Sequence, residues 1–183
     1  MSNIINMRKK LLFTLALLLT AATGAWADGS CGSGLTWTLS SGTLTISKTS
    51  DGTGAMTEYD WGARPWYSPK DEITSVVICD GVTDIGQYTF HAHSNLASLT
   101  IGNSLETIGV WAFKSCSMTS VTFPASVKSI GNSAFSDCNN LTSVTLNSNP
   151  QIQPNAFPVK TTVTMNLPAN SADGAYWTTF YND

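Results

Sequence analysis

The chain has 183 residues, of which 42% are hydrophobic and only 11% are charged, and its formal net charge is −3. Because an average soluble protein carries about 25% charged residues, this chain must rely on its many Ser, Thr, Asn and Gly residues for solubility, as β-rich extracellular domains do. Basic residues cluster only at 8–10, so the chain lacks the Lys and Arg patches that a phosphate backbone requires, and nucleic acid is excluded as a partner.

The first 27 residues have the order of a secretory signal peptide. Basic residues 8–10 precede an apolar run over 11–22, and the small-x-small sequence Ala25-Trp26-Ala27 follows. The run is too short to span a bilayer, which takes about 20 residues. We therefore predict a Sec-type signal peptide (1–27) cleaved after Ala27, a secreted or surface-exposed mature chain with 6 basic and 12 acidic residues, and no membrane span.

Residues 28–72 are predicted to form an N-terminal cap. Apolar and polar residues alternate over 35–40 and again over 43–47, on either side of Ser41-Gly42. This alternation around a Gly-containing turn is typical of a β-hairpin with one buried face. From residue 49 to residue 70 the chain is loop-like and punctuated by Gly and Pro.

The loop is aromatic, and two interpretations of its rings remain open. In the first, the rings cover the apolar cross-section that a solenoid leaves exposed at its first coil. In the second, Trp61, Trp66 and Tyr67 stack on a sugar and make the protein a carbohydrate-binding domain. Mutating the three rings separates the two interpretations, because a cap would lose stability and a sugar site would lose binding.

Residues 73–162 repeat one phrase four times. The units begin at Ile73, Leu96, Met118 and Leu141, at spacings of 23, 22 and 23 residues. A fixed period in this range is the signature of a solenoid. We therefore predict a mainly β fold, a short solenoid of about four coils of 22–23 residues, which we number coils 1 to 4. It lies between the N-terminal cap and a C-terminal cap over 163–183.

Each unit divides its side chains between an inner and an outer face. Apolar residues recur at positions 1, 4, 6, 10, 13 and 18 of the units, and positions 4 and 6 share one face of a strand, so positions 3 and 5 point outward. The outward hydroxyl columns include Ser98, Thr100, Ser120 and Thr122. They suit ligand binding, because each hydroxyl can donate and accept, and they suit plain solubility equally well.

Interruptions of these columns are the better candidates for specificity. Val77 stands among threonines in the first unit, and Trp111 and Lys114 interrupt the pattern in the second unit. A Gly also recurs after each Val-x-x-Ile, where we expect either a positive φ or a close approach between coils.

The residues carry a resemblance. The phrase Leu141-Thr-Ser-Val-Thr-Leu146, with Val127-Lys-Ser-Ile-Gly131 and Ala134-Phe-Ser-Asp-Cys138, resembles the bacterial surface-antigen-type (BspA-like) leucine-rich repeats. Pro65-Trp66-Tyr67 is similar to the segment that introduces such repeats, and Leu167-Pro168 with Tyr176, Trp177 and Phe180 is similar to their closing cap. The resemblance implies a secreted or surface solenoid concerned with adhesion or protein binding.

The four cysteines allow two arrangements. Cys31 and Cys79 are predicted as a disulfide, because Cys79 follows the first repeated strand, where the cap must dock, and secreted chains permit disulfides. Cys116 and Cys138 share a column with His93. Stacked coils repeat at about 4.8 Å, so these three are predicted to be buried core residues in preference to zinc ligands.

No motif supports an enzyme. The chain has two histidines, without a Ser-His-Asp context or a nucleophile elbow, so a hydrolase is the weakest alternative. We predict a non-enzymatic adhesion module that needs no cofactor or metal and contacts a host protein or glycan. Its ligand, surface retention and oligomeric state are not encoded in any motif.

Overall fold

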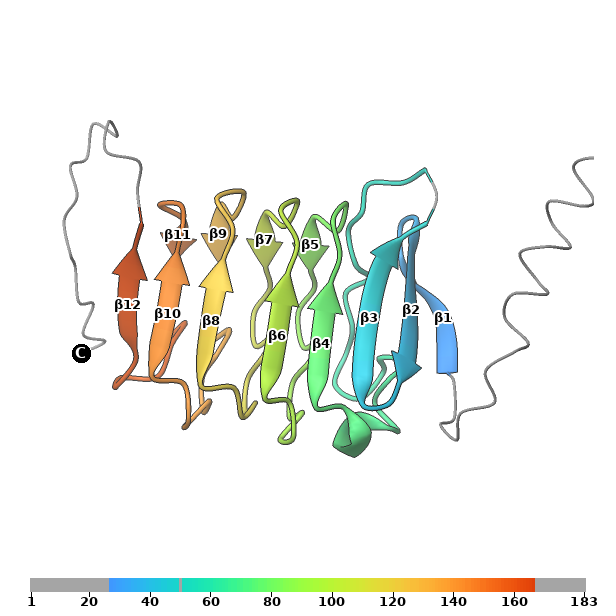
Figure 1. The fold of residues 1–183 in the computed structure, drawn as a ribbon, viewed down its shortest axis with the longest axis horizontal. Coiled ribbons are helices and arrows are strands. Elements are labelled where there is room, and N and C mark those ends of the chain that lie inside the picture. The colour runs from blue at the N-terminus through green and yellow to red at the C-terminus, as the bar shows by residue number, and fades with distance from the viewer. Residues whose placement is uncertain (1–26, 50, 167–183) are drawn as a thin grey trace, which may run out of the picture.

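The computed structural model describes residues 27–49 and 51–166, which form an elongated β-solenoid (Figure 1). The signal peptide prediction, apart from Ala27, and residues 167–183 of the predicted C-terminal cap lie outside this range. Strands make up nearly all of the regular structure, as predicted. Among the described residues, no helix is long and apolar enough to cross a membrane.

The regular elements alternate between long and short strands. In chain order they are β1 (Ala27–Gly32), β2 (Leu35–Ser40), β3 (Thr43–Lys48), the 3-10 turn η1 (Lys70–Glu72), β4 (Ser75–Ile78), β5 (Asp84–Ile85), β6 (Ser98–Ile101), β7 (Thr107–Ile108), β8 (Ser120–Phe123), β9 (Ser129–Ile130), β10 (Ser143–Leu146), β11 (Gln151–Ile152) and β12 (Thr162–Met165).

Coils stack in register. The two-residue strands form one parallel sheet in the order β5-β7-β9-β11, and the longer strands form the opposite side, in the orders β1-β2-β3-β4-β6 and β8-β10-β12. Each coil therefore contributes one strand to each side, as Figure 1 shows. Val76 pairs with Leu99 and Val121 with Val144, which aligns identical positions of successive units and keeps each apolar column inside.

The N-terminal hairpin continues the solenoid sheet. Strands β2 and β3 are antiparallel, and their two-residue turn has positive φ at Ser41 (47°) and Gly42 (75°), the primed turn that matches strand twist. Strand β3 then pairs in parallel with β4, Leu44 beside Val76. The predicted hairpin is confirmed. It extends the sheet of long strands beyond β4.

Strand β1 was not predicted. Its sequence is Ala-Asp-Gly-Ser-Cys-Gly, and Gly and Asp are depleted in strands. It forms because its backbone pairs with the open edge of β2. At Gly29 a β-carbon would lie 2.9 Å from Nε1 of Trp37, so the missing side chain makes room for the indole.

A stack of rings runs through the core along the solenoid axis. Phe90, Phe113, Phe135 and Phe157 stack with centroid separations of 5.0, 4.9 and 5.5 Å. Trp66 from the loop adds a ring at the N-terminal end, 5.7 Å from Phe90 and nearly parallel to it. The repeated Phe therefore joins the coils into one continuous core.

The repeated glycines mark close approach between coils. Gly86, Gly109 and Gly131 do not have positive φ. A β-carbon at Gly109 would lie 2.6 Å from the backbone N of Gln87, and one at Gly131 would lie 2.8 Å from the carbonyl carbon of Gly109. Of the two predicted reasons for these glycines, the structure confirms the tight approach.

The long-strand sheet is interrupted between β6 and β8, where Figure 1 shows a wider space between neighbouring strands. Coil 2 has 22 residues and its neighbours have 23, and the missing residue falls between Cys116 and Met118. In coils 1 and 3 the corner closes with Leu96 N donating to His93 O and Leu141 N to Cys138 O. Within the described residues, the shorter corner before β8 has no such bond, and Ser117 N donates instead to Leu96 O. Strand β8 does not pair with β6.

The solenoid extends further than predicted. Strand β12 pairs in parallel with β10, Val163 beside Val144. The parallel stack therefore continues to Met165, three residues past the predicted boundary at residue 162.

Candidate functional site

The aromatic loop serves first as a cap, through two side chains that bond to coil 1. At this corner each coil donates backbone N–H groups to carbonyls of the next coil. From coil 1 to coil 2, Phe90 N donates to Ala112 O and Ala92 N to Lys114 O. Coil 1 has no preceding coil to supply the equivalent donors to Thr89 O and His91 O. Trp66 Nε1 donates to Thr89 O at 2.9 Å, and Arg64 Nη2 donates to His91 O.

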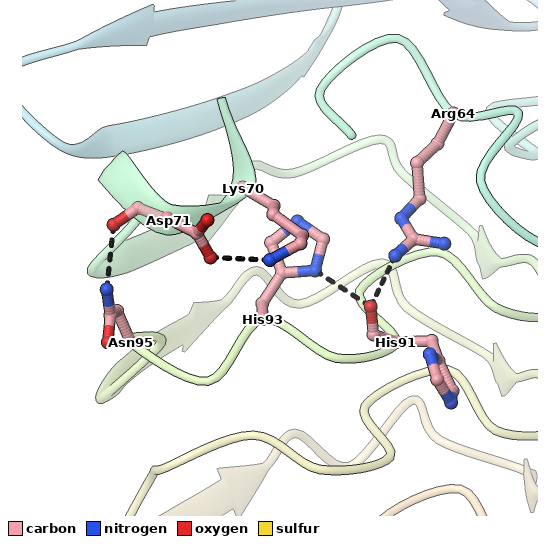
Figure 2. Close-up of polar contacts among 6 residues, drawn as sticks. All are labelled: Arg64, Lys70, Asp71, His91, His93 and Asn95. Atoms are coloured by element: carbon pink, nitrogen blue, oxygen red, sulfur yellow. Dashed lines mark hydrogen bonds and ion pairs between the residues drawn. The ribbon is translucent and has the colours of Figure 1, made fainter. Parts of the chain in front are cut away.

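Figure 2 shows this corner from close by. The Arg64 guanidinium points at the His91 carbonyl, and Nδ1 of His93 lies 3.2 Å from the same oxygen. On the other side, Asn95 Nδ2 donates to Asp71 O at 2.8 Å, and Lys70 pairs with Asp71 at 2.5 Å. The loop and η1 are thus fastened to coil 1 by polar side chains.

Arg64 is an unusual cap residue because it is a buried cation. Its side chain is only 3% exposed, and Nε and Nη1 have no hydrogen-bond partner within the described part of the chain. Its carbon Cζ lies 4.8 Å from the Tyr67 ring centroid, a cation–π contact. Burial lowers the pKa of the guanidinium.

The prediction that Trp66 contributes to a sugar site is therefore wrong. Trp66 has no exposed surface and lies between Trp37, Tyr59 and Phe90, so it cannot contact a ligand. Tyr67 is half-buried beside Arg64. Only Trp61 is open to solvent, with 65% of its surface exposed.

Trp61 begins a second group of rings, on the outside of the corner that follows the short strands. Its centroid lies 4.2 Å from that of His91 and 6.3 Å from that of Tyr88. Tyr88 lies 5.1 Å from Trp111, and Lys114 Nζ lies 5.7 Å from the Trp111 centroid. We call Trp61, Tyr88 and Trp111 the aromatic strip.

Two residues of the aromatic strip have left-handed backbone. Tyr88 (φ 56°) and Trp111 (φ 55°) occupy the sixteenth position of their coils, and the equivalents are Ser133 (φ 53°) and Asn155 (φ 57°). A bulky residue in this region costs on the order of 1 kcal/mol. Tyr88 was not predicted as a site residue. The signal for it is the equivalent position of the four units, which is aromatic in two of them and polar in the other two.

The predicted hydroxyl residues lie on the outer side of the long strands. Ser98 and Thr100 on β6 and Ser120 and Thr122 on β8 are exposed, and they border the interruption of the sheet. A cavity of about 360 Å³ lies there, lined by Leu99, Thr100, Ile101, Asn103, Ser120, Thr122, Pro124 and Asn147.

The apolar residues of this opening differ from those elsewhere. Leu99 and Ile101 are only partly buried, whereas their counterparts Val76 and Ile78 are fully buried. The opening between β6 and β8 therefore combines hydroxyls, two apolar side chains and the edges of two strands that do not pair with each other.

All four cysteines are free. Strands β2 and β3 lie between β1, which carries Cys31, and Cys79 at the end of β4. At about 4.8 Å per strand the two α-carbons are separated by roughly twice the 7 Å that a disulfide can span. The structure therefore does not bring the predicted pair together.

The column of His93, Cys116 and Cys138 is buried, as predicted. Cys116 Sγ donates to Phe90 O at 3.2 Å and Cys138 Sγ to Phe113 O at 3.0 Å. Burial, with the nearby charge of Arg64, lowers the pKa of His93 to about 4, and burial raises the pKa of Cys116. Within residues 27–49 and 51–166, no cluster of three or more His, Cys, Asp or Glu could hold a metal ion.

The last coil borders a further cavity. The cavity has a volume of about 400 Å³, and its lining includes Ile152, Ala156, Phe157, Val163 and Met165. Residues 167–183 of the predicted C-terminal cap lie outside the described range.

The sequence and the fold both resemble those of known proteins. The sequence matches the family described as BspA type leucine-rich repeat region, in six copies over residues 66–182. The fold resembles a leucine-rich repeat protein from Eubacterium ventriosum, with 24% identity and a TM-score of 0.61, over 80% of this chain and 45% of that one.

A second similar structure is the leucine-rich repeat protein of T. pallidum, with 22% identity and a TM-score of 0.50, over 82% of this chain and 71% of that one. In the first of these matches, the chain spans less than half the length of the E. ventriosum protein. At these identities the two structures establish the fold alone. No curated protein matches the chain.

Proposed function

The chain belongs to the BspA-type leucine-rich repeat family, and from that premise we propose that it is a secreted or cell-surface binding module, without enzymatic activity, that adheres to a host protein or glycan. Repeat solenoids offer extended, preformed surfaces for binding. The low charge and the exposed hydroxyl columns suit a ligand recognised by hydrogen bonds and shape. A signal peptide over residues 1–27 would deliver the module to the outside of the cell.

One observation carries the protein-binding part of this proposal, namely the opening between β6 and β8. Unpaired strand edges are templates for another extended chain. Here the edges border an open cavity whose lining includes the partly buried Leu99 and Ile101 and the exposed Thr100 and Thr122. An extended segment of a partner protein would place alternate side chains on those apolar residues and bond its backbone to the strand edges.

Binding of the mature chain to purified extracellular-matrix proteins and mucin tests the proposal. Thr122→Lys puts a charged side chain at the opening and should reduce binding at least tenfold. The matched control is Thr162→Lys, which makes the same change at an exposed position of β12, two strands away from β8, and should leave binding unchanged.

Insertion of one Asn after Ser117 tests the same site in a second way. It restores a 23-residue unit, so β8 should pair with β6, as β6 does with β4. Hydrogen exchange at Thr100 and Thr122 should slow, and binding should fall although the protein becomes more stable. Binding that survives both changes would place the ligand elsewhere, and failure of the wild-type chain to bind any of these proteins would contradict the proposal.

A further inference from the structure

We propose that the aromatic strip of Trp61, Tyr88 and Trp111 is a carbohydrate-binding site, which holds one soluble glycan chain along the solenoid axis. The strip lies on the corner that follows the short strands, so it is separate from the opening between β6 and β8. The inference does not depend on protein binding at that opening, and each site can fail by itself.

The strip presents its rings at the repeat distance of the coils. The centroids of Trp61 and Tyr88 are 6.3 Å apart, and those of Tyr88 and Trp111 are 5.1 Å apart. Because successive coils are stacked at about one strand spacing, ~4.8 Å, each step along the axis offers a new ring. An extended glycan chain likewise advances by one sugar ring per step, and the C–H face of a sugar packs on an aromatic ring.

The tilt of the rings selects the form of glycan. The Trp61 and Tyr88 rings are inclined by 66° and the Tyr88 and Trp111 rings by 54°, so the strip is twisted. A crystalline polysaccharide presents coplanar sugar faces, which cannot lie on all three rings. A single chain in solution can rotate about each glycosidic bond to match them.

The surroundings of the strip favour a sugar over a protein. Beyond Trp111 the column continues with Ser133 and Asn155, whose hydroxyl and amide groups both donate and accept hydrogen bonds. Within the described residues, the exposed large apolar side chains are Trp61, Val110 and Val159, and Tyr88 and Trp111 are partly buried, so little exposed apolar surface surrounds the strip. Protein hot spots, in contrast, lie in well-packed patches that exclude water.

The backbone of the strip favours a small polar residue over an aromatic one. Tyr88 and Trp111 are left-handed, a conformation that Asn adopts more readily than aromatic residues do. Ser133 and Asn155 have the same backbone conformation, so the turn belongs to the repeat and does not require an aromatic residue. Coil 4 has Asn at the equivalent position, so Trp111→Asn is a substitution that this fold already tolerates.

Affinity electrophoresis of the mature chain in native gels containing soluble mucin glycans, xylan, laminarin or amylose tests the inference, with crystalline cellulose and chitin as pull-down controls. At least one soluble polysaccharide should retard the wild-type chain, and the crystalline ones should not bind it. The variant Trp61→Ala/Trp111→Asn should lose at least tenfold in affinity, while its Tm stays equal or rises. Val159→Asn, at an exposed apolar residue outside the strip, is the control and should bind as wild type does.

Three results would overturn the inference. They are the absence of retardation in every soluble polysaccharide, wild-type affinity in the double variant, and a fall in Tm that accompanies lost binding, since the last would make the rings structural. In each case the protein-binding assays with Thr122→Lys remain interpretable, because that residue lies on the other side of the coil.

Discussion

Two groups of aromatic residues meet at the N-terminal end of the solenoid and face opposite ways. The inner group, Trp37, Tyr59 and Trp66, is buried and continues the core stack to Phe90. In the outer group, Trp61 lies five residues before Trp66 and is 65% exposed. Neighbouring rings of one loop thus belong to two different surfaces.

Hydrogen bonding to the first coil distinguishes the two groups. The Trp66 indole N–H bonds to Thr89 O, and Arg64 bonds to His91 O, where a preceding coil would otherwise donate. Trp61 only covers His91 from outside. A cap must therefore supply hydrogen-bond donors to the carbonyls of the first coil as well as cover its apolar surface, because unpaired buried carbonyls are costly.

The largest effect is expected at Trp66. Trp66→Ala removes a fully buried ring and should lower the free energy of unfolding by about 3–5 kcal/mol, measured by urea denaturation. Trp66→Phe keeps a ring in the stack and loses the N–H donor, so it should cost less. If Trp66→Ala were as stable as wild type, the inner group would not be a cap.

Acid should weaken the cap through His93. Its pKa is about 4 in the folded protein and about 6.5 when unfolded, so the unfolded chain binds more protons between these values. Stability contributed by neutral His93 is complete above about pH 6.5 and decreases towards pH 4, by roughly 3 kcal/mol. His93→Cys, the residue of the same column in coils 2 and 3, should remove most of this loss in pH-dependent urea melts. An unchanged pH dependence would show that other groups cause it.

A smaller effect is expected at Arg64. Arg64→Met fills the space and removes one of the two groups that contact His91 O, leaving Nδ1 of His93. This should cost about 1 kcal/mol, since removal of a buried cation offsets part of the loss. Thermal unfolding of the two proteins measures the difference. Greater stability of Arg64→Met would mean that its hydrogen bond is not required for the cap.

The smallest effect on stability is expected in the outer group. Trp61→Ala should change the free energy of unfolding by less than about 1 kcal/mol, because surface substitutions away from special features have small effects. Urea denaturation of Trp61→Ala and Trp66→Ala under the same conditions measures the difference in unfolding free energy between the two groups. A loss similar to that of Trp66→Ala would merge the two groups into one cap.

Much of the fold could be predicted, because the repeat aligns like residues. Ile78, Ile101, Phe123 and Leu146 are one apolar column in the sequence, and in the structure Ile78 pairs with Ile101 and Phe123 with Leu146. The hairpin of residues 35–48 was also predictable from its alternation. Strand β1 was not, because its Gly and Asp residues have no strand preference and only the open edge of β2 recruits them.

The candidate sites were predictable in part. Trp61, Trp111 and Lys114 lie together on one corner, and Thr100 and Thr122 border the opening, but Trp66 proved to be core. A single sequence does not show which side of a loop faces the coil, since that depends on which carbonyls remain unpaired. Cys31 and Cys79 were paired from their positions along the chain, and the intervening strands keep them apart.

By itself, the sequence determined the period, the inward columns and the family, because burial of apolar side chains at fixed spacing leaves few other folds open. Only the tertiary structure decided how the ends and exceptions behave. The long-strand sheet is open between β6 and β8, after the coil that is one residue shorter, and two partly buried rings with left-handed backbone lie on one corner. Both depend on distances between coils, which arise when the chain stacks on itself.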